Sequence, residues 1–438
     1  MFIKTINAIV LMKKTTPTYR FIFVLLFSVL SVGLQQTTFA AETEQVFKSY
    51  KNRLLQIRVI DKSTNTKSTI GSGFYIDSKG TIATNYHVIS KHVFHPKQYR
   101  IEYSTHDNQV FQAELVHVDA IHDLAILHSE VTDTPLLRTS HHEVENGVRI
   151  YTLGNPMDLG MSIVEGTYNG LTDDTMHERI LLSGALNSGM SGGPSITADG
   201  AVVGVNVATA GNSIGFLVPV KYLTLLIAEK PKTPPKDFIA LIHQQLLVNQ
   251  NRYISSLLSK PLPTQELGDY IVPAKMADYI TCWGDSKETG MPYRKSDSFC
   301  ATKNNIYLNS KLSTGTTQYI HHYLEAKPKS MNQFQFAALM QSYYSNPSSS
   351  LSGYEEDFTE FQCKTDHVQH HTLKLKMAFC LRQYKKFTGL YDMVLSAASL
   401  TEKTRGIVTT LSLSGVSYEN AIKFSKHYME TFRWKHPS

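Results

Sequence analysis

The chain has 438 residues, of which 42% are apolar, 10% aromatic and 18% charged. This composition is typical of folded domains and excludes a disordered or fibrous protein. The formal net charge is +6, but four cations lie in an N-terminal segment without acids, and the remaining 39 of the 43 basic residues nearly balance the 37 acidic ones. So small an excess predicts no nucleic-acid partner and no binding to a membrane surface.

Residues 1–40 have the pattern of a secretory signal peptide. A positively charged region precedes an apolar run at residues 21–34, and small side chains follow at positions 38 and 40, so we expect cleavage after Ala40. The run is too short to span a bilayer comfortably, which disfavours an uncleaved anchor. Translation could also start at Met12. No other stretch approaches 18 apolar residues, so the sequence predicts a periplasmic or secreted protein without a membrane span after signal removal.

Residues 41–229 contain many short apolar runs that are rich in branched side chains and separated by Gly and Asn turns. The runs are residues 54–60, 73–76, 81–84, 100–103, 110–116, 124–127, 148–153, 161–166, 180–182, 202–208 and 215–218. This pattern favours antiparallel β-barrels over alternating strands and helices. A short helix over residues 221–230 is expected to end this mainly β domain.

The stretch from Asn187 to Pro194 places Ser191 in a glycine-rich turn. A serine hydroxyl is a poor nucleophile at neutral pH and needs a base and an orienting carboxylate. His87 follows a predicted strand, and Asp123 precedes an apolar run. The order His, Asp, Ser along the chain is that of chymotrypsin and differs from subtilisin and the α/β-hydrolases. The sequence therefore predicts a catalytic triad of His87, Asp123 and Ser191.

Three other interpretations of these residues are disfavoured. An esterase nucleophile elbow would also fit Gly189-x-Ser191-x-Gly193, but a helix should then follow the serine, whereas the next residues lead into a turn and a strand. The elbow's histidine should also lie downstream, and no downstream histidine has surroundings comparable to those of His87. Ser72, between two glycines, is expected to enter a strand and not to be a second nucleophile. The histidines between positions 92 and 142 lack paired spacing on one element, so the sequence predicts no metal and no cofactor.

Six motifs resemble the HtrA/Deg branch of the trypsin-like serine proteases, in that family's order. They are Gly71-Ser72-Gly73-Phe74-Tyr75-Ile76-Asp77, Thr84 to Ile89, Asp123-Leu124-Ala125-Ile126-Leu127, Gly154-Asn155-Pro156, Ser191-Gly192-Gly193-Pro194 and Ile214 to Pro219. The resemblance covers residues 45 to 229. It implies two six-stranded antiparallel barrels, as in chymotrypsin, with the catalytic residues in the cleft between them.

The resemblance also implies roles for residues beyond the triad. The backbone N–H groups of Gly189 and Ser191 match the oxyanion-hole positions. Ala185 would form the base of the primary substrate pocket, and Val207 and Ala208 its wall. None of these is acidic, so a small or medium apolar side chain is expected there. Met190 departs from the family, which usually has Asn before the serine, and we recognise no PDZ module after the protease domain.

The second half of the chain carries no active-site pattern. Prolines mark residues 230–263 as a linker that contains a helix at 237–258. Residues 264–438 are expected to form an α+β domain of unknown fold that holds all four cysteines. In an exported protein these predict disulfides, and the short local loops of similar spacing favour Cys282–Cys300 and Cys363–Cys380 over the other two pairings. The similar spacing also suggests an internal duplication.

The sequence thus predicts an exported serine endopeptidase that hydrolyses protein or peptide substrates through an acyl-enzyme, in quality control or processing in the bacterial envelope. The alternative is a binding or adaptor protein, whose C-terminal domain recognises a partner while the protease domain is a scaffold or selective effector. The oligomeric state is left open.

Overall fold

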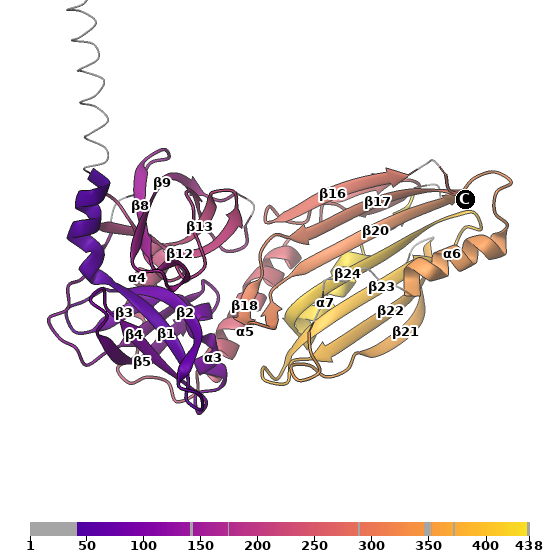
Figure 1. Ribbon diagram of the computed structural model, residues 1–438. Coiled ribbons are helices and arrows are strands. Elements are labelled where there is room, and N and C mark those ends of the chain that lie inside the picture. Colours follow the sequence, from indigo (N-terminus) through magenta and orange to yellow (C-terminus); the bar gives the residue numbers. More distant parts are fainter. Residues whose placement is uncertain are drawn as a thin grey trace, which may run out of the picture.

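The computed structural model describes residues 42–435 apart from 141–142, 174, 288–289, 346–350, 352 and 371–372. The predicted signal peptide and its cleavage site lie outside the described residues. Two barrels form one end of the molecule, a long twisted sheet forms the other, and helix α5 lies between them (Figure 1). No helix in the described ranges has the length and apolar character needed to cross a membrane.

The first barrel closes in the strand order β1-β2-β3-β6-β5-β4. Its strands are β1 (Leu54–Asp61), β2 (Thr66–Tyr75), β3 (Thr81–Thr84), β4 (Tyr99–Ser104), β5 (Val110–Asp119) and β6 (Leu124–His128). Short strands rich in branched side chains bury residues such as Ile57, Val59 and Ile82 completely inside the barrel. Helix α3 (Tyr86–Phe94) follows β3, where the sequence predicted no helix.

The second barrel has the order β8-β9-β10-β13-β12-β11 and is closed by pairing between β11 and β8. Its strands are β8 (Arg149–Gly154), β9 (Ser162–Leu171), β10 (Ile180–Ser183), β11 (Pro194–Ile196), β12 (Ala201–Gly211) and β13 (Ile214–Pro219), with β7 (Arg138–Thr139) parallel to β12. Short 3-10 turns occur at η2 (Lys51–Arg53) and η3 (Pro156–Asp158), and helix α4 (Val220–Ala228) ends the domain. The prediction of two six-stranded antiparallel barrels is confirmed.

Helix α5 (Phe238–Leu258) joins the barrels to the C-terminal domain through buried contacts on both sides. Asp237 caps its start by accepting a hydrogen bond from the Ala240 N–H at 3.0 Å. The Gln245 amide donates to the Val118 carbonyl of β5 at 2.7 Å and accepts from the Ala120 N–H at 3.0 Å. On the other side, Gln250 accepts from the Asn420 amide at 2.7 Å. The segment predicted as a linker is therefore a helix fixed between two bodies.

The C-terminal domain is built on a seven-stranded antiparallel sheet in the order β16-β17-β20-β24-β23-β22-β21. The sheet strands are β16 (Ile280–Lys287), β17 (Tyr293–Thr302), β20 (Thr317–Ala326), β21 (Gln362–His370), β22 (Leu373–Gln383), β23 (Leu390–Ser399) and β24 (Arg405–Ser417). Helices α6 (Gln333–Ser345) and α7 (Tyr418–Met429) cover opposite faces, because α7 packs on Ala397 and α6 on Ala398. The smaller strands are β14 (Thr264–Leu267), β15 (Tyr270–Pro273) and β25 (Arg433–Trp434), and β18 (Ile306–Asn309) with β19 (Leu312–Thr314). The expected combination of strands and helices is confirmed.

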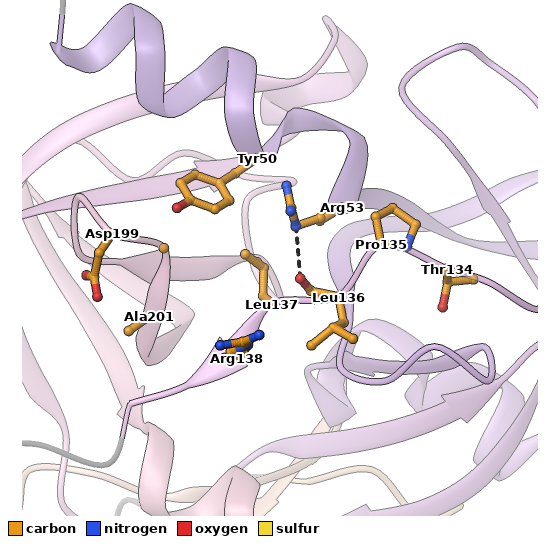
Figure 2. Close-up of a pocket in the computed structure, with 10 residues that line it drawn as sticks. Tyr50, Arg53, Thr134, Pro135, Leu136, Leu137, Arg138, Asp199 and Ala201 are labelled. Carbon is orange, nitrogen blue, oxygen red and sulfur yellow. Dashed lines mark hydrogen bonds between the residues drawn. The ribbon is translucent and has the colours of Figure 1, made fainter.

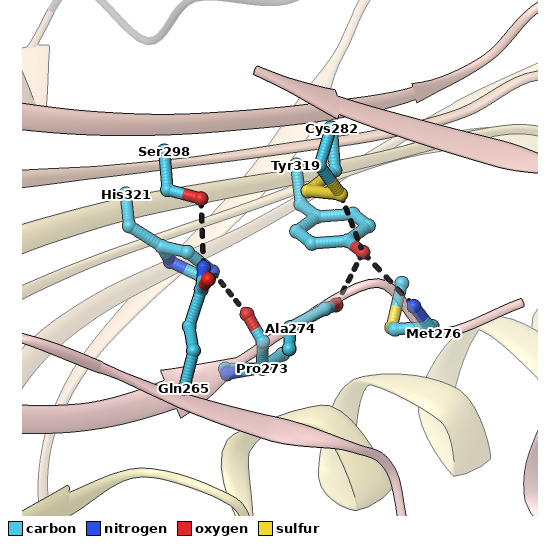
Figure 3. The surroundings of a disulfide bond; sticks show 9 residues. Gln265, Pro273, Ala274, Met276, Cys282, Ser298, Tyr319 and His321 are labelled. Atoms are coloured by element: carbon cyan, nitrogen blue, oxygen red, sulfur yellow. Dashed lines mark hydrogen bonds between the residues drawn. A yellow bond between two sulfur atoms is a disulfide. The ribbon is translucent and has the colours of Figure 1, made fainter. Parts of the chain in front are cut away.

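The disulfides join Cys282 to Cys300 and Cys363 to Cys380, the two local pairs that the spacing favoured. Each joins residues directly opposite each other on neighbouring strands. Figure 3 shows the first disulfide beside Tyr319, whose hydroxyl donates to the Ala274 carbonyl at 2.5 Å. Cys300 packs in the core under α7, whereas Cys380 alternates with residues of that core and so lies on the other face. The internal duplication remains a hypothesis. If the two disulfide hairpins are copies of one unit, their disulfides lie on opposite faces of the sheet.

One hydrophobic core crosses the boundary between the barrels and the C-terminal domain. It contains Ile57 and Val93 from the first barrel and its helix, Leu246 from α5, and Leu308 and Phe387 from the C-terminal domain. Separating these parts would expose apolar surface that is now buried, at about 25 cal/mol per Å². We therefore expect residues 41–230 to lose stability when they are separated from the rest of the chain.

Candidate active site

Helix α3 carries His87 in its first turn, and Asp123 fixes that turn from the neighbouring loop. The Asp123 carbonyl accepts hydrogen bonds from the Tyr86 N–H at 3.2 Å and from the Asn85 amide at 2.8 Å. Asp123 has a left-handed φ of 65°, a conformation that Asp and Asn tolerate better than most other side chains. The helix is thus capped by a residue of the loop between β5 and β6 of the same barrel and not by its own N-cap side chain, which makes no capping bond.

Both carboxylate oxygens of Asp123 bind His87. Oδ1 accepts from the backbone N–H of His87 at 2.8 Å, and Oδ2 lies 2.6 Å from the ring atom Nδ1. A proton on Nδ1 satisfies this contact and leaves Nε2 free to accept a proton. Burial lowers the pKa of His87, but the charge of Asp123 and its hydrogen bond raise it, and the resulting pKa lies above the ordinary 6.5. The pair therefore stabilises the imidazolium form.

The turn that carries Ser191 docks onto the first barrel beside His87. The Ser191 carbonyl accepts from the Ser72 N–H of β2 at 2.7 Å. Gly192 has φ +86°, and a Cβ there would lie 2.3 Å from the Thr84 hydroxyl and 2.9 Å from the Asn85 N. Only glycine allows this approach to the corner that leads into α3. The structure thus places the turn of Ser191 against the segment that leads into the helix of His87.

The Ser191 hydroxyl donates to the Val207 carbonyl at 3.4 Å, and within the described ranges it forms no hydrogen bond with His87. A serine side chain has three staggered rotamers and turns between them readily. Nucleophile and base are often further apart in a protease without substrate than during reaction. The Ser191 hydroxyl is therefore turned toward β12 in this structure.

The peptide groups that carry the two predicted oxyanion donors are oriented by hydrogen bonds to their carbonyl oxygens. The Ser188 carbonyl accepts from the Met157 N–H at 2.8 Å, and the Met190 carbonyl accepts from the Gly193 N–H at 3.0 Å. In a trans peptide the N–H points away from the C=O, so the amides of Gly189 and Ser191 point away from these partners. Neither amide donates a hydrogen bond within the described residues. Gly189 is required because its φ is +94° and a Cβ would lie 2.4 Å from the Asn155 carbonyl.

Buried polar side chains that the sequence did not mark hold this turn. The Ser72 hydroxyl, 1% exposed, donates to the Gly189 carbonyl at 2.7 Å and accepts from the Asn155 N–H at 2.9 Å. The Asn206 amide donates to the carbonyls of Leu153 at 3.0 Å and Met190 at 3.2 Å. Ser72 was expected to be a strand residue, and it is, but the Gly-Ser-Gly spacing alone gave no sign of this contact.

Met190, the departure from the family pattern, is completely buried in the core of the second barrel with Leu182, Leu186 and Leu217. An Asn at this position could hold the turn of Ser191 by hydrogen bonds, whereas Met190 holds it by apolar packing. The core of the second barrel therefore keeps the turn rigid.

The predicted pocket residues lie on two neighbouring segments of the second barrel. Ala185 is exposed in the loop after β10. Val207 and Ala208 lie at a bulge in β12, where the register to β13 shifts. The assignment of these three residues to a substrate pocket stays a prediction.

A separate cavity of about 490 Å³ lies away from these residues, between the N-terminal segment and the turn after β11 (Figure 2). Arg53 donates from Nε to the Leu136 carbonyl at 2.9 Å, and Tyr50 packs against Gly200. These contacts fasten the N-terminal segment to both barrels, and the cavity contains none of the predicted catalytic residues.

Known proteins are similar in sequence to the part of the chain that forms the barrels. Residues 71–205 match the family model of the trypsin-like peptidase domain. A probable periplasmic serine endoprotease, DegP-like, from Chlamydia muridarum is 29% identical over 160 residues, which cover 34% of this chain and 31% of that protein. The mitochondrial serine protease HTRA2 of Drosophila willistoni is 29% identical over 167 residues, which cover 36% and 37%. The chain thus spans about a third of the length of these curated relatives.

Two solved structures are similar over the same part of the chain. The serine endoprotease from Yersinia pestis is 24% identical with a TM-score of 0.38, covering 43% of this chain and 65% of that one. A protease from M. tuberculosis in its active form is 21% identical with a TM-score of 0.39, covering 43% and 86%.

Residues 71–205, which span much of both barrels, are therefore similar to a trypsin-like peptidase domain. Their sequence is similar to the HtrA and DegP serine endoproteases, and the resemblance predicted from the motifs is confirmed.

Proposed function

We propose that the chain is an exported serine endopeptidase that uses Ser191 as nucleophile, His87 as base and Asp123 as orienting carboxylate. The observation that carries this proposal is the His87–Asp123 pair, held by two hydrogen bonds against the turn of Ser191. A protein that only used this domain as a scaffold would not need both carboxylate oxygens on one histidine.

The reaction follows from these positions. As the Ser191 hydroxyl attacks a peptide carbonyl, Nε2 of His87 takes the hydroxyl proton and then gives it to the departing amine. This leaves an acyl-enzyme on Ser191. Water, deprotonated by the same nitrogen, attacks the ester and releases the acid, which restores the serine. Asp123 keeps the proton on Nδ1 throughout and stabilises the imidazolium.

The amides of Gly189 and Ser191 would bind the negative oxygen of each tetrahedral intermediate. Their orientation is fixed before substrate arrives, so no reorganisation is needed during the reaction. Removing one such donor costs about 3–4 kcal/mol of activation free energy in related sites.

The substrate class is protein or peptide, with a small or medium apolar side chain before the cleaved bond. That preference rests on Ala185, Val207 and Ala208. The relatives named as periplasmic support a role in the bacterial envelope, in quality control or processing.

A fluorophosphonate probe tests the proposal on the full mature chain. We expect the probe to label Ser191, located by peptide mass mapping, and the same sample to cleave an unfolded protein. Ser191→Ala should abolish both signals while keeping the far-UV spectrum. A folded wild-type sample that takes up no probe would refute the proposal. Sequencing the new termini then gives the side-chain preference.

A further inference from the structure

The hairpin of β18 and β19 leaves the C-terminal sheet and lies on the helix that carries His87. The Tyr86 hydroxyl donates to the Leu308 carbonyl at 2.7 Å, in a buried contact between residues 222 positions apart. Ile306 and Leu308 share a hydrophobic core with Val88 and Ile89 of α3. Figure 1 shows β18 beside α3 at the junction of the two bodies. The hairpin is therefore part of the packing of α3.

Tyr307, between those two core residues, contacts the histidine itself. Its ring centroid lies 5.9 Å from that of His87, with an interplanar angle of 73°. Its hydroxyl lies 3.4 Å from the Ser90 hydroxyl, which donates to the His87 carbonyl at 3.0 Å. Edge-to-face contacts of this kind are favourable beyond the area that they bury. Tyr307 therefore touches both the imidazole and the helical turn behind it.

The imidazole needs a constraint of this kind. Asp123 holds one edge of the ring through Nδ1. A single hydrogen bond at one edge leaves the ring free to tilt about that edge, and the tilt displaces Nε2, the atom that must meet the Ser191 proton. The side chain of His87 is still 26% exposed, so solvent leaves room for this motion.

We propose that Tyr307 is a positioning residue for His87, so that the C-terminal domain completes the active site of the protease domain. This inference rests on the proposed function, because it gives His87 the role of the base. The connection between the two domains is rigid, because two residues of helix α5 bind to opposite sides. Gln245 binds the first barrel and Gln250 binds α7. The domain is then a component of the catalytic apparatus and not only a tether for substrates.

Variants of Tyr307 in the full mature chain test this role. Tyr307→Phe keeps the ring, and Tyr307→Leu keeps an apolar side chain without the ring. Tyr418→Ala removes an exposed tyrosine on α7 and is the control for general effects on the domain. Active-site titration with the fluorophosphonate probe counts competent sites, so that kcat is expressed for each of them and loss of folded protein does not enter.

We expect Tyr307→Leu to lower kcat per titrated site about tenfold with little change in KM, because one aromatic contact of this type is lost. Tyr307→Phe should stay within about twofold of wild type, as should Tyr418→Ala. A purely structural role would reduce the number of titrated sites and leave kcat per site unchanged, and that result would overturn the proposal. Equal kcat for the Leu and Phe variants would also overturn it.

The outcome for the wild-type chain separates this proposal from the one on which it rests. If wild type takes up no probe, the proposed function fails. If wild type is labelled and active while Tyr307→Leu behaves in the same way, only the role of Tyr307 fails.

Discussion

Ser72→Ala should weaken both the fold and the catalysis of the protease domain. The hydroxyl bridges two buried backbone groups, the Gly189 carbonyl and the Asn155 N–H, at 2.7 and 2.9 Å. Removing it leaves both without a partner, and each such group costs about 1–3 kcal/mol. We expect the free energy of unfolding of the barrels to fall by about 2–6 kcal/mol, the sum for the two groups.

The kinetic effect of Ser72→Ala follows from the position of the Gly189 carbonyl. This carbonyl anchors the residue whose own amide is the proposed oxyanion donor, so its release lets the donor turn away. Complete loss of one donor lowers kcat by about 10²–10³. Partial displacement should therefore lower kcat per titrated site by about 10–100-fold, with little change in KM.

Ser129→Ala is the matched control for Ser72→Ala. Ser129 is also a buried serine with two partners, the Tyr103 hydroxyl at 2.8 Å and the Val131 N–H at 3.3 Å, but it lies in the first barrel outside the turn of Ser191. It should lose similar stability and keep its kcat. Urea unfolding followed by far-UV circular dichroism measures the stability. A Ser72→Ala variant with wild-type kcat would refute the reasoning.

Three further predictions use the same chain. Asp123→Asn should keep the fold but lower kcat about 10⁴-fold, as loss of the triad carboxylate does in chymotrypsin-type enzymes; a loss below tenfold in steady-state kinetics would contradict its role. Because neutral His87 is the proposed base and its pKa is raised, kcat/KM should fall as pH decreases through a midpoint above 6.5, and a flat profile from pH 5 to 8 would exclude it as the base. Reducing the two disulfides, which close loops of 18 and 17 residues, should destabilise the C-terminal domain by about 3 kcal/mol each; both tryptophans, Trp283 and Trp434, lie there, so an unchanged fluorescence transition in urea would contradict this.

The barrel strands and the turn of Ser191 could be predicted because their signals are local. Short runs of residues with branched side chains, separated by Gly and Asn turns, predicted the barrel strands. The glycines around Ser191 predicted its turn. The disulfide pairs also followed from spacing, since two cysteines on neighbouring strands of a hairpin are close in sequence.

Helix α3 could not be predicted because its N-terminal contacts come from elsewhere. Its residues include Val88, Ile89 and Val93, whose branched side chains favour strands. The acid that caps it, Asp123, is 36 residues away. An isolated helix of nine residues is not stable in water, so only the tertiary contacts make it helical.

The supporting residues of the site were missed for the same reason. Ser72 meets the Gly189 carbonyl 117 residues along the chain, and Tyr307 meets Ser90 across 217 residues. A serine between glycines and a tyrosine between apolar residues are common in any sequence. Ser72 and Tyr307 reach the site only because the barrels close and because the hairpin of β18 and β19 packs on α3.

The position of the disulfides connects the stability of the C-terminal domain to the active site. Cys300 lies near the end of β17, from which the chain continues directly into β18 and Tyr307. Cys380 lies near the end of β22, just before Phe387, which belongs to the core shared with α3. Each disulfide therefore fixes the end of a strand from which the chain continues into residues that contact α3 or its core. Reduction that loosens these ends should also loosen the contact between Tyr307 and His87, so an oxidising compartment favours both the fold of the C-terminal domain and the geometry of the triad.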